Sequence, residues 1–404
     1  MRQHGLKLGR SATEWTIRIS LVFLAMGIGF VSVTYSLAEV VKLDNPSYAH
    51  EIAPGNARIS ALLAQKLFAA SPEADPQSSP AGLARLAISQ DPTAVQAVAT
   101  LGLQAQLAGN APIARRFFDY AQLLSRRDIY TQLWAIEDAV RRGDVPGALR
   151  HYDIALRTEP QMADVLFPIL AVSSVQPVIQ VALVDTLVRN SPWAADFVNY
   201  LASQNPHPRE NAVLLLKLRR AGLAVPESAR SGAIYALILK DHADEAWSYY
   251  SATQPGVDRR RSRDPRFRLA TPPTPLDWVA INEGGISSSL QAPGVDFAAS
   301  TSAGGPLLRQ YELLPPGEYR LTGRTAALDA EEGAHPYWIL MCQSGRELGR
   351  VELNNSTQDA STFVGTFSVP ADCPIQMLML IARPSNRISG LSGRIDYVQL
   401  NSIR

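Results

Sequence analysis

Side chains that could do chemistry are scattered along this sequence rather than grouped. The chain has 6 histidines, and none is spaced to share a metal ion or a proton with another. Asp329, Glu331 and Glu332 form an acidic run, but glycoside hydrolysis needs two carboxyl groups facing each other across a cleft. We interpret the run as a solvated turn. The motifs of serine hydrolases, zinc proteases and nucleotide-binding loops are absent. We therefore predict no catalytic residue, no metal site and no cofactor, and a hydrolase is the least favoured hypothesis.

Aromatic side chains in the last third of the chain suggest sugar binding, because an exposed ring can stack on a sugar ring. The candidate platform consists of Trp278, Tyr311, Tyr337 and Trp338. Packing in a core is the alternative, and it is favoured for the two tryptophans because a buried ring hides much apolar area. Adjacent residues of a strand point to opposite faces. An inward Trp338 therefore predicts an outward Tyr337.

The two cysteines, Cys342 and Cys373, lie on or beside predicted strands. In an oxidising compartment such a pair forms a disulfide. Closing a loop of about 30 residues would stabilise the fold by roughly 3–4 kcal/mol in the chain-entropy model. Two buried free thiols are the alternative. No CxxC motif or clustered histidine accompanies them, so a zinc site is not expected.

A repeat in the first half predicts the elements that position these groups. Small, aromatic and glycine residues recur at a spacing of 34 residues, the distance from Ala114 to Ala148. The matching positions are Gly109, Ala114, Phe118 and Ala121 in one copy, Gly143, Ala148, Tyr152 and Ala155 in the next, and Pro160 in phase with Pro92. Alanine allows two helices to cross closely, an aromatic ring fills the groove between hairpins, and glycine lets the chain reverse.

This pattern resembles the tetratricopeptide repeat (TPR), a helix–turn–helix unit. The resemblance is clearest over residues 92–160 and extends loosely over 56–253. Six hairpins are expected there, over 57–91, 95–126, 129–160, 163–192, 194–221 and 228–253. The resemblance implies a right-handed superhelix whose groove binds a protein partner. It places Gln96, Gln106, Tyr130 and Glu137 on the groove side.

The N-terminus carries a membrane signal. Residues 19–37 contain no charge, and a run of this length can cross a hydrocarbon core. Basic residues before it predict a cytoplasmic segment over 1–18, an anchor over 19–41 and an exported body that begins with a tether over 42–55. A cleaved signal peptide is the alternative, because Ser36-Leu37-Ala38 resembles a cleavage site. The length of the run favours an uncleaved anchor and a single-pass protein of a bacterial inner membrane, with most of the chain in the periplasm.

The pattern changes after the helical region. Residues 254–275 contain six arginines and five prolines, which is typical of a linker. We interpret it as a solvated hinge, with contact to anionic lipid or acidic polysaccharide as the alternative. Residues 276–404 alternate with a period of two, which predicts an antiparallel β-sandwich. Segment 314–321 resembles a turn and strand common in exported β-sandwich modules. Segment 393–400 resembles the closing strand of galactose-binding-like jelly rolls, a fold shared by many carbohydrate-binding modules.

The predicted fold class is multidomain α + β, with an N-terminal transmembrane helix, a TPR-like α-solenoid and a C-terminal jelly-roll-like β-sandwich. The 404 residues include 38 basic and 37 acidic ones, a balance that argues against nucleic-acid binding. We predict a membrane-anchored periplasmic scaffold that joins proteins of the cell envelope, in polysaccharide assembly or export. The alternative is a glycan-binding protein that acts through the sandwich, with an envelope polysaccharide as its ligand.

Overall fold

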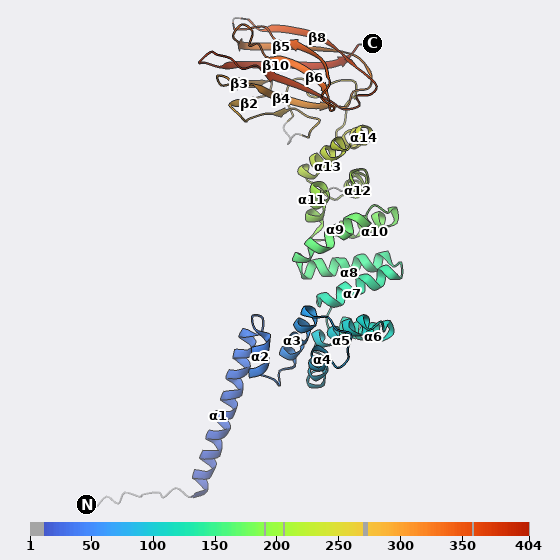
Figure 1. The fold of residues 1–404 in the computed structure, drawn as a ribbon, viewed down its shortest axis with the longest axis vertical. Coiled ribbons are helices and arrows are strands. Elements are labelled where there is room, and N and C mark those ends of the chain that lie inside the picture. The colour runs from blue at the N-terminus through green and yellow to red at the C-terminus, as the bar shows by residue number, and fades with distance from the viewer. Residues whose placement is uncertain (1–11, 190, 205–206, 270–273, 358, 404) are drawn as a thin grey trace, which may run out of the picture. The chain divides into compact units, whose positions relative to one another are not determined.

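The computed structural model describes residues 12–189, 191–204, 207–269, 274–357 and 359–403. It contains a long apolar helix at the N-terminus, further helices and two antiparallel sheets that form a sandwich (Figure 1). The predicted fold class is therefore confirmed. The chain divides into two compact units, residues 1–162 and 163–404, and each is described by itself. The predicted domain boundaries stay predictions.

The first unit begins with the apolar helix α1 (Ala12–Val41). Its part from Trp15 to Val41 is long and apolar enough to cross a membrane. The helices that follow are α2 (Pro46–Ile52), α3 (Ala57–Ala70), α4 (Ser79–Gln90), α5 (Val95–Leu107), α6 (Ala111–Leu124), α7 (Ile129–Arg141) and α8 (Val145–Thr158). The last six form three hairpins at the predicted places.

Helix α2 lies inside the segment predicted as a tether. The Asn45 side chain accepts a hydrogen bond from the Tyr48 N–H, and proline stands at the first helical position, so the sequence favours a helix start there. Ala49 of α2 packs in one buried cluster with Ala38 of α1 and Ile59 of α3. The segment after the span is therefore packed between α1 and α3.

Phe118 is the central side chain of the repeat. Its ring stacks on Trp134 of the next hairpin, with ring centroids 4.5 Å apart. A Cβ on Gly102 would lie 2.9 Å from the same ring, so only glycine lets α5 approach it this closely. Phe118 thus fills the space between two neighbouring hairpins, where the repeat pattern predicts it.

The other repeat positions lie as follows. Gly109 and Gly143 end the turns after α5 and α7 with φ of +76° and +70°, a region that glycine enters without steric cost. The remaining small and aromatic positions, Ala114, Ala121, Ala148, Tyr152 and Ala155, are buried. Pro160 opens a short 3₁₀ helix, Pro160–Met162. The TPR-like spacing therefore coincides with helix–helix contacts.

The helices of the second unit are α9 (Ala163–Ser173), α10 (Pro177–Val188), α11 (Ala194–Gln204), α12 (Pro208–Arg220), α13 (Glu227–Leu239) and α14 (Ala243–Thr253). The odd-numbered helices pack in one row and the even-numbered helices in another. Phe167 and Phe197 meet edge to face, with ring centroids 5.2 Å apart, between the first two odd-numbered helices. Aromatic packing therefore replaces the alanine-rich contacts of the first unit.

Within the described residues the sandwich has ten strands in two sheets, ordered β1-β4-β9-β6-β7 and β2-β3-β10-β5-β8. The strands are β1 (Val279–Ala280), β2 (Ile286–Leu290), β3 (Val295–Ala299), β4 (Gly305–Glu312), β5 (Gly317–Asp329), β6 (Tyr337–Cys342), β7 (Glu347–Glu352), β8 (Ser361–Val369), β9 (Gln376–Ala382) and β10 (Leu391–Ser402). All paired strands are antiparallel. The structure places Cys342 and Cys373 in a disulfide that joins the end of β6 to the turn before β9.

The arginine-rich segment after α14 packs against the sandwich. Arg263 and Phe267 are buried, at 7% and 4% exposure, and Arg261 forms a β-bridge with Asn401. Arg263 donates hydrogen bonds to the carbonyl groups of Leu276 and Tyr311. The prediction of a solvated hinge is therefore wrong for the part that contains Arg263, because its guanidinium satisfies backbone acceptors inside the fold.

Arg263 belongs to a buried polar cluster that joins α14 to the sandwich. Its guanidinium carbon lies 5.3 Å from the centroid of the Tyr250 ring, and its Nη1 lies 3.5 Å from Oε2 of Glu312. The Tyr250 hydroxyl donates to Asp277 over 2.6 Å. We call Tyr250, Arg263, Asp277 and Glu312 the joint cluster.

The two carboxyl groups of the joint cluster differ in hydrogen bonding. Asp277 accepts hydrogen bonds from the Tyr250 hydroxyl and from the N–H and hydroxyl of Thr274. Among the described residues neither oxygen of Glu312 has a hydrogen-bond donor. Burial raises the pKa of Glu312 to about 7, the nearby Arg263 opposes this, and the Asp277 charge adds to it.

We predict that the free energy of unfolding falls between about pH 4.5 and pH 7 because of Glu312. A raised pKa in the folded state means that folding favours the protonated acid, so this stabilisation is complete below the ordinary pKa of 4.5 and lost as pH approaches 7. The pKa difference corresponds to a loss on the order of 3 kcal/mol. Denaturant unfolding across this range should show the fall in the wild type and a flatter profile for Glu312→Gln. Glu318→Gln, at an exposed position of β5, is the control, and identical profiles for wild type and Glu312→Gln would contradict the assignment.

Candidate functional site

A groove runs across the odd-numbered helices of the second unit. It encloses a cavity of about 680 Å³ between α9, α11 and α13. The lining residues are Ala163, Asp164, Phe167, Asp196, Asn199, Tyr200, Ala202, Ser203, Ser228, Ala229 and Gly232. We call this the helical groove. The repeat pattern predicts a groove on this row of helices.

Small residues form the floor of the helical groove and aromatic residues form its wall. A Cβ on Gly232 would lie 3.0 Å from the carbonyl oxygen of Ala202, so α13 approaches α11 as closely as glycine allows. The rings of Phe167 and Tyr200 lie with centroids 5.7 Å apart. A close floor beside an aromatic wall leaves a slot suited to an apolar side chain.

Two carboxylates give the helical groove its charge. Asp164 and Asp196 lie in the first turns of α9 and α11, where the helix dipole favours negative charge. Both are exposed, and within the described ranges neither has an ion-pair partner. The lining contains no lysine or arginine. The groove therefore offers an apolar wall and two carboxylates that can bind a cation.

Asp164 and Asp196 were not among the predicted groove residues. The repeat phase weakens after residue 160, and the predicted positions Gln96, Gln106, Tyr130 and Glu137 all belong to the first unit. A local signal was present, since each aspartate follows an alanine at the start of a predicted first helix. Among the predicted positions, Gln106 accepts a hydrogen bond from the Trp134 indole and so serves packing.

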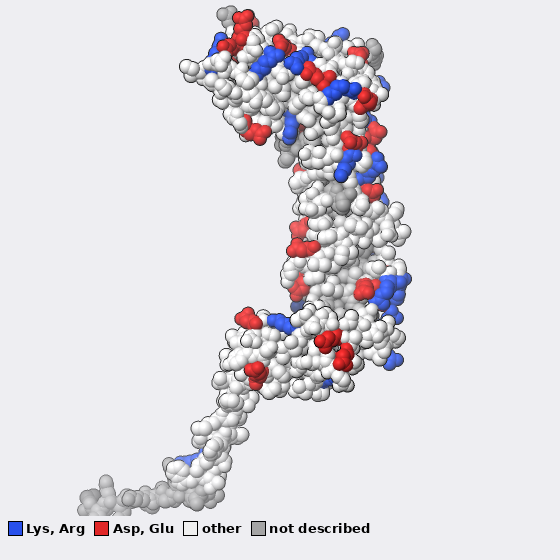
Figure 2. Space-filling view, viewed as in Figure 1, with Lys and Arg blue, Asp and Glu red and all other residues white. Residues whose placement is uncertain are grey.

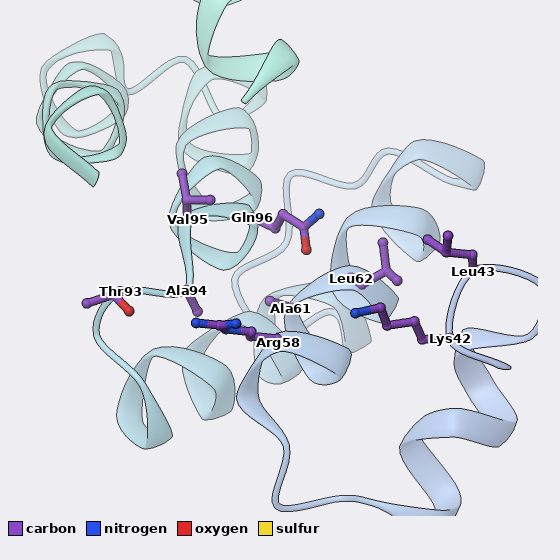
Figure 3. A pocket seen from close by; sticks show the side chains of 9 residues that line it. All are labelled: Lys42, Leu43, Arg58, Ala61, Leu62, Thr93, Ala94, Val95 and Gln96. Carbon is purple, nitrogen blue, oxygen red and sulfur yellow. The ribbon is translucent and has the colours of Figure 1, made fainter. Parts of the chain in front are cut away.

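The first unit has a cavity of its own beside the end of α1, with a volume of about 320 Å³. Figure 3 shows the side chains of Lys42, Arg58, Leu62 and Gln96 among those that line it. Gln96 is one of the predicted groove residues. Lys42 forms an ion pair with Glu39 and follows directly on the apolar stretch of α1.

The four residues of the predicted glycan platform do not form one surface. Trp278 and Trp338 are at most 2% exposed, and their rings pack together with centroids 5.7 Å apart. Neither ring offers a free face, so the core alternative holds for both. Tyr311 and Tyr337 are half-buried. They lie on β4 and β6, on opposite sides of β9, opposite Met377 and Ile381 respectively.

Tyr337 is the centre of a charged cluster on the sheet. The guanidinium carbons of Arg350 and Arg383 each lie 4.8 Å from its ring centroid, a distance typical of cation–π contact. Arg350 donates two hydrogen bonds to Glu347, of 2.9 and 2.8 Å, and Arg383 donates one of 2.5 Å to Glu352. Acidic and basic side chains alternate in a row across the sandwich in Figure 2. The ring is therefore surrounded by charged hydrogen-bonding groups.

Comparison with known proteins gives neighbours in structure only. No family model matches the sequence, and no curated protein matches it. Among solved structures, "CBM4 structure and function" shares 14% identity over 32% of this chain and 88% of that chain, with a TM-score of 0.26. A CBM61 module solved with β-1,4-galactotriose shares 15% identity over 31% of this chain and 88% of that chain, with a TM-score of 0.23. A family 16 carbohydrate-binding module shares 15% identity over 29% of this chain and 84% of that chain, with a TM-score of 0.22.

Proposed function

We propose that this protein is a membrane-anchored adaptor that holds a partner protein in the helical groove. The observation that carries the proposal is the pair Asp164 and Asp196, which face a groove without any basic lining residue. Helix α1 supplies the anchor, and the basic residues before it favour a body outside the cytoplasm. A role in polysaccharide assembly or export rests on the combination of anchor, groove and sandwich.

The groove chemistry defines the partner segment. The Phe167 and Tyr200 rings favour an apolar side chain in the slot, because burying apolar area contributes about 25 cal/mol per Å². The two aspartates favour lysine or arginine beside it, since hydrogen bonds to a charged group contribute roughly 1.5–3 kcal/mol. A short segment with a basic residue next to apolar ones satisfies both requirements.

We predict that the full chain in detergent micelles binds synthetic peptides with one arginine between apolar residues better than the same peptides with glutamate. Loss of one charge-assisted contact should weaken binding about tenfold in Asp164→Asn or Asp196→Asn. Fluorescence anisotropy measures the preference between the two peptides and the loss of affinity in each variant. Asp185→Asn is the control, because this exposed α10 aspartate pairs with Arg189 and lies outside the groove. Equal binding of the two peptides, or a double variant with wild-type affinity, would refute the groove as the partner site.

Glycan binding by the sandwich is the second candidate function. The supporting observation is that Tyr337 presents a half-buried ring among the guanidinium groups of Arg350 and Arg383 and the carboxylates of Glu347 and Glu352. Guanidinium donors and carboxylate acceptors can bond sugar hydroxyl groups, and the planar guanidinium also fits the carboxylate of an acidic sugar.

If the sandwich binds glycans at Tyr337, removing the ring should weaken that binding. On an array of envelope polysaccharides, the full chain with Tyr337→Ala should lose at least about tenfold in affinity, because both the ring and the arginines it orders are disturbed. Tyr397→Ala is the matched control, since Tyr397 is a half-buried tyrosine on β10 of the other sheet. Wild-type binding by Tyr337→Ala, or no glycan bound by the wild type, would argue against this candidate.

A further inference from the structure

A second cavity of the second unit lies where α12 ends, α13 begins and α14 ends. Its volume is about 250 Å³. Arg219 comes from the last turn of α12, Glu227 and Arg230 from the first turn of α13, and Tyr249 and Thr253 from the end of α14. It shares no lining residue with the helical groove. We call it the arginine pocket.

Arg230 is the unusual residue of this pocket. It is only 8% exposed, and it forms an ion pair with Glu227 one turn back on the helix. Its Nη2 is the atom that pairs with Glu227, whereas its Nε has no hydrogen-bond partner in the part of the chain that the structure describes. Leaving a buried charged donor without an acceptor costs more than the roughly 1–3 kcal/mol of a neutral group. A group of this kind needs an acceptor from outside the chain, either water or an anion.

Two further donors reach the same cavity. Burial raises the pKa of Tyr249 to about 12, so at neutral pH its hydroxyl keeps the proton and can donate it. Arg219 donates to the carbonyl group of Thr253 over 3.4 Å, which holds the side chain across the end of α14. Two guanidinium groups and a phenol therefore meet at one cavity, against the single carboxylate of Glu227.

We propose that the arginine pocket binds an oxyanion, a phosphate or carboxylate group, through Arg230, Arg219 and the Tyr249 hydroxyl. Guanidinium groups match the geometry of both anions with paired N–H donors. The volume exceeds the roughly 30 Å³ of one water several-fold, so the anion can carry a small substituent such as a sugar. Its binding would join α12 and α13 to the end of α14, beside the joint cluster.

Thermal unfolding of the full chain in detergent tests this site with inorganic phosphate and with acetate. Chloride at matched ionic strength is the reference. Phosphate or acetate should raise Tm above the value in chloride, because an anion that binds only the folded state stabilises it. A rise with phosphate alone assigns a phosphate group, and a rise with acetate alone assigns a carboxylate. Titration calorimetry with the effective anion should show affinity about tenfold weaker in Arg219→Gln and in Tyr249→Phe.

Arg220→Gln is the matched control, because Arg220 is an exposed neighbour on α12 that does not line the cavity. It should retain wild-type affinity. Arg230→Met should abolish binding, and if that variant does not fold, Arg219→Gln and Tyr249→Phe decide the question. No Tm difference between the oxyanions and chloride would overturn the proposal. So would wild-type affinity in both Arg219→Gln and Tyr249→Phe, which would indicate nonspecific binding elsewhere.

Discussion

The buried guanidinium of Arg263 is the contact on which the second unit depends. It bonds two carbonyl groups of the sandwich, approaches the carboxyl group of Glu312 and stacks over Tyr250 of the last helix. A buried charge is tolerated only when it is paired and hydrogen-bonded. Separating the helices from the sandwich would break the Tyr250–Asp277 bond and remove Tyr250 from this cation. The contact between the last helix and the sandwich is therefore buried and depends on these particular polar side chains.

Further hydrogen bonds connect the helices of the second unit to the sandwich. Gln343 of the sandwich donates to the Ile238 carbonyl of α13, and Arg259 reaches from the connecting segment to Asp244 of α14 and to the Leu313 carbonyl of the sandwich. These bonds surround the joint cluster with further crosslinks. The helical groove and the Tyr337 face therefore both belong to this packed unit, which suits the adaptor role proposed above.

The sequence predicted what depends on local periodicity. Six hairpins and the strands of the sandwich follow from spacing, and Phe118 was placed by its repeat position. Periodicity could not predict which side chains are buried by residues far away in the sequence. Arg263 looks like its solvated neighbours in composition, and only the fold reveals that it meets the Leu276 and Tyr311 carbonyls. The predicted groove residues all lie in the first unit, and the two aspartates of the helical groove lie where the repeat pattern had weakened. Trp278 and Trp338 had two open interpretations, which strand direction alone could not separate.

A distance measurement across the joint tests most directly whether helices and sandwich form one body. Spin labels on cysteines replacing Ser203 of α11 and Thr362 of β8 occupy exposed positions, and the native cysteines are joined in the disulfide. Double electron–electron resonance should give a single narrow distance distribution in the otherwise wild-type chain. Arg263→Met should broaden it. A broad distribution without that substitution, or the same narrow distribution with it, would contradict a rigid joint held by Arg263.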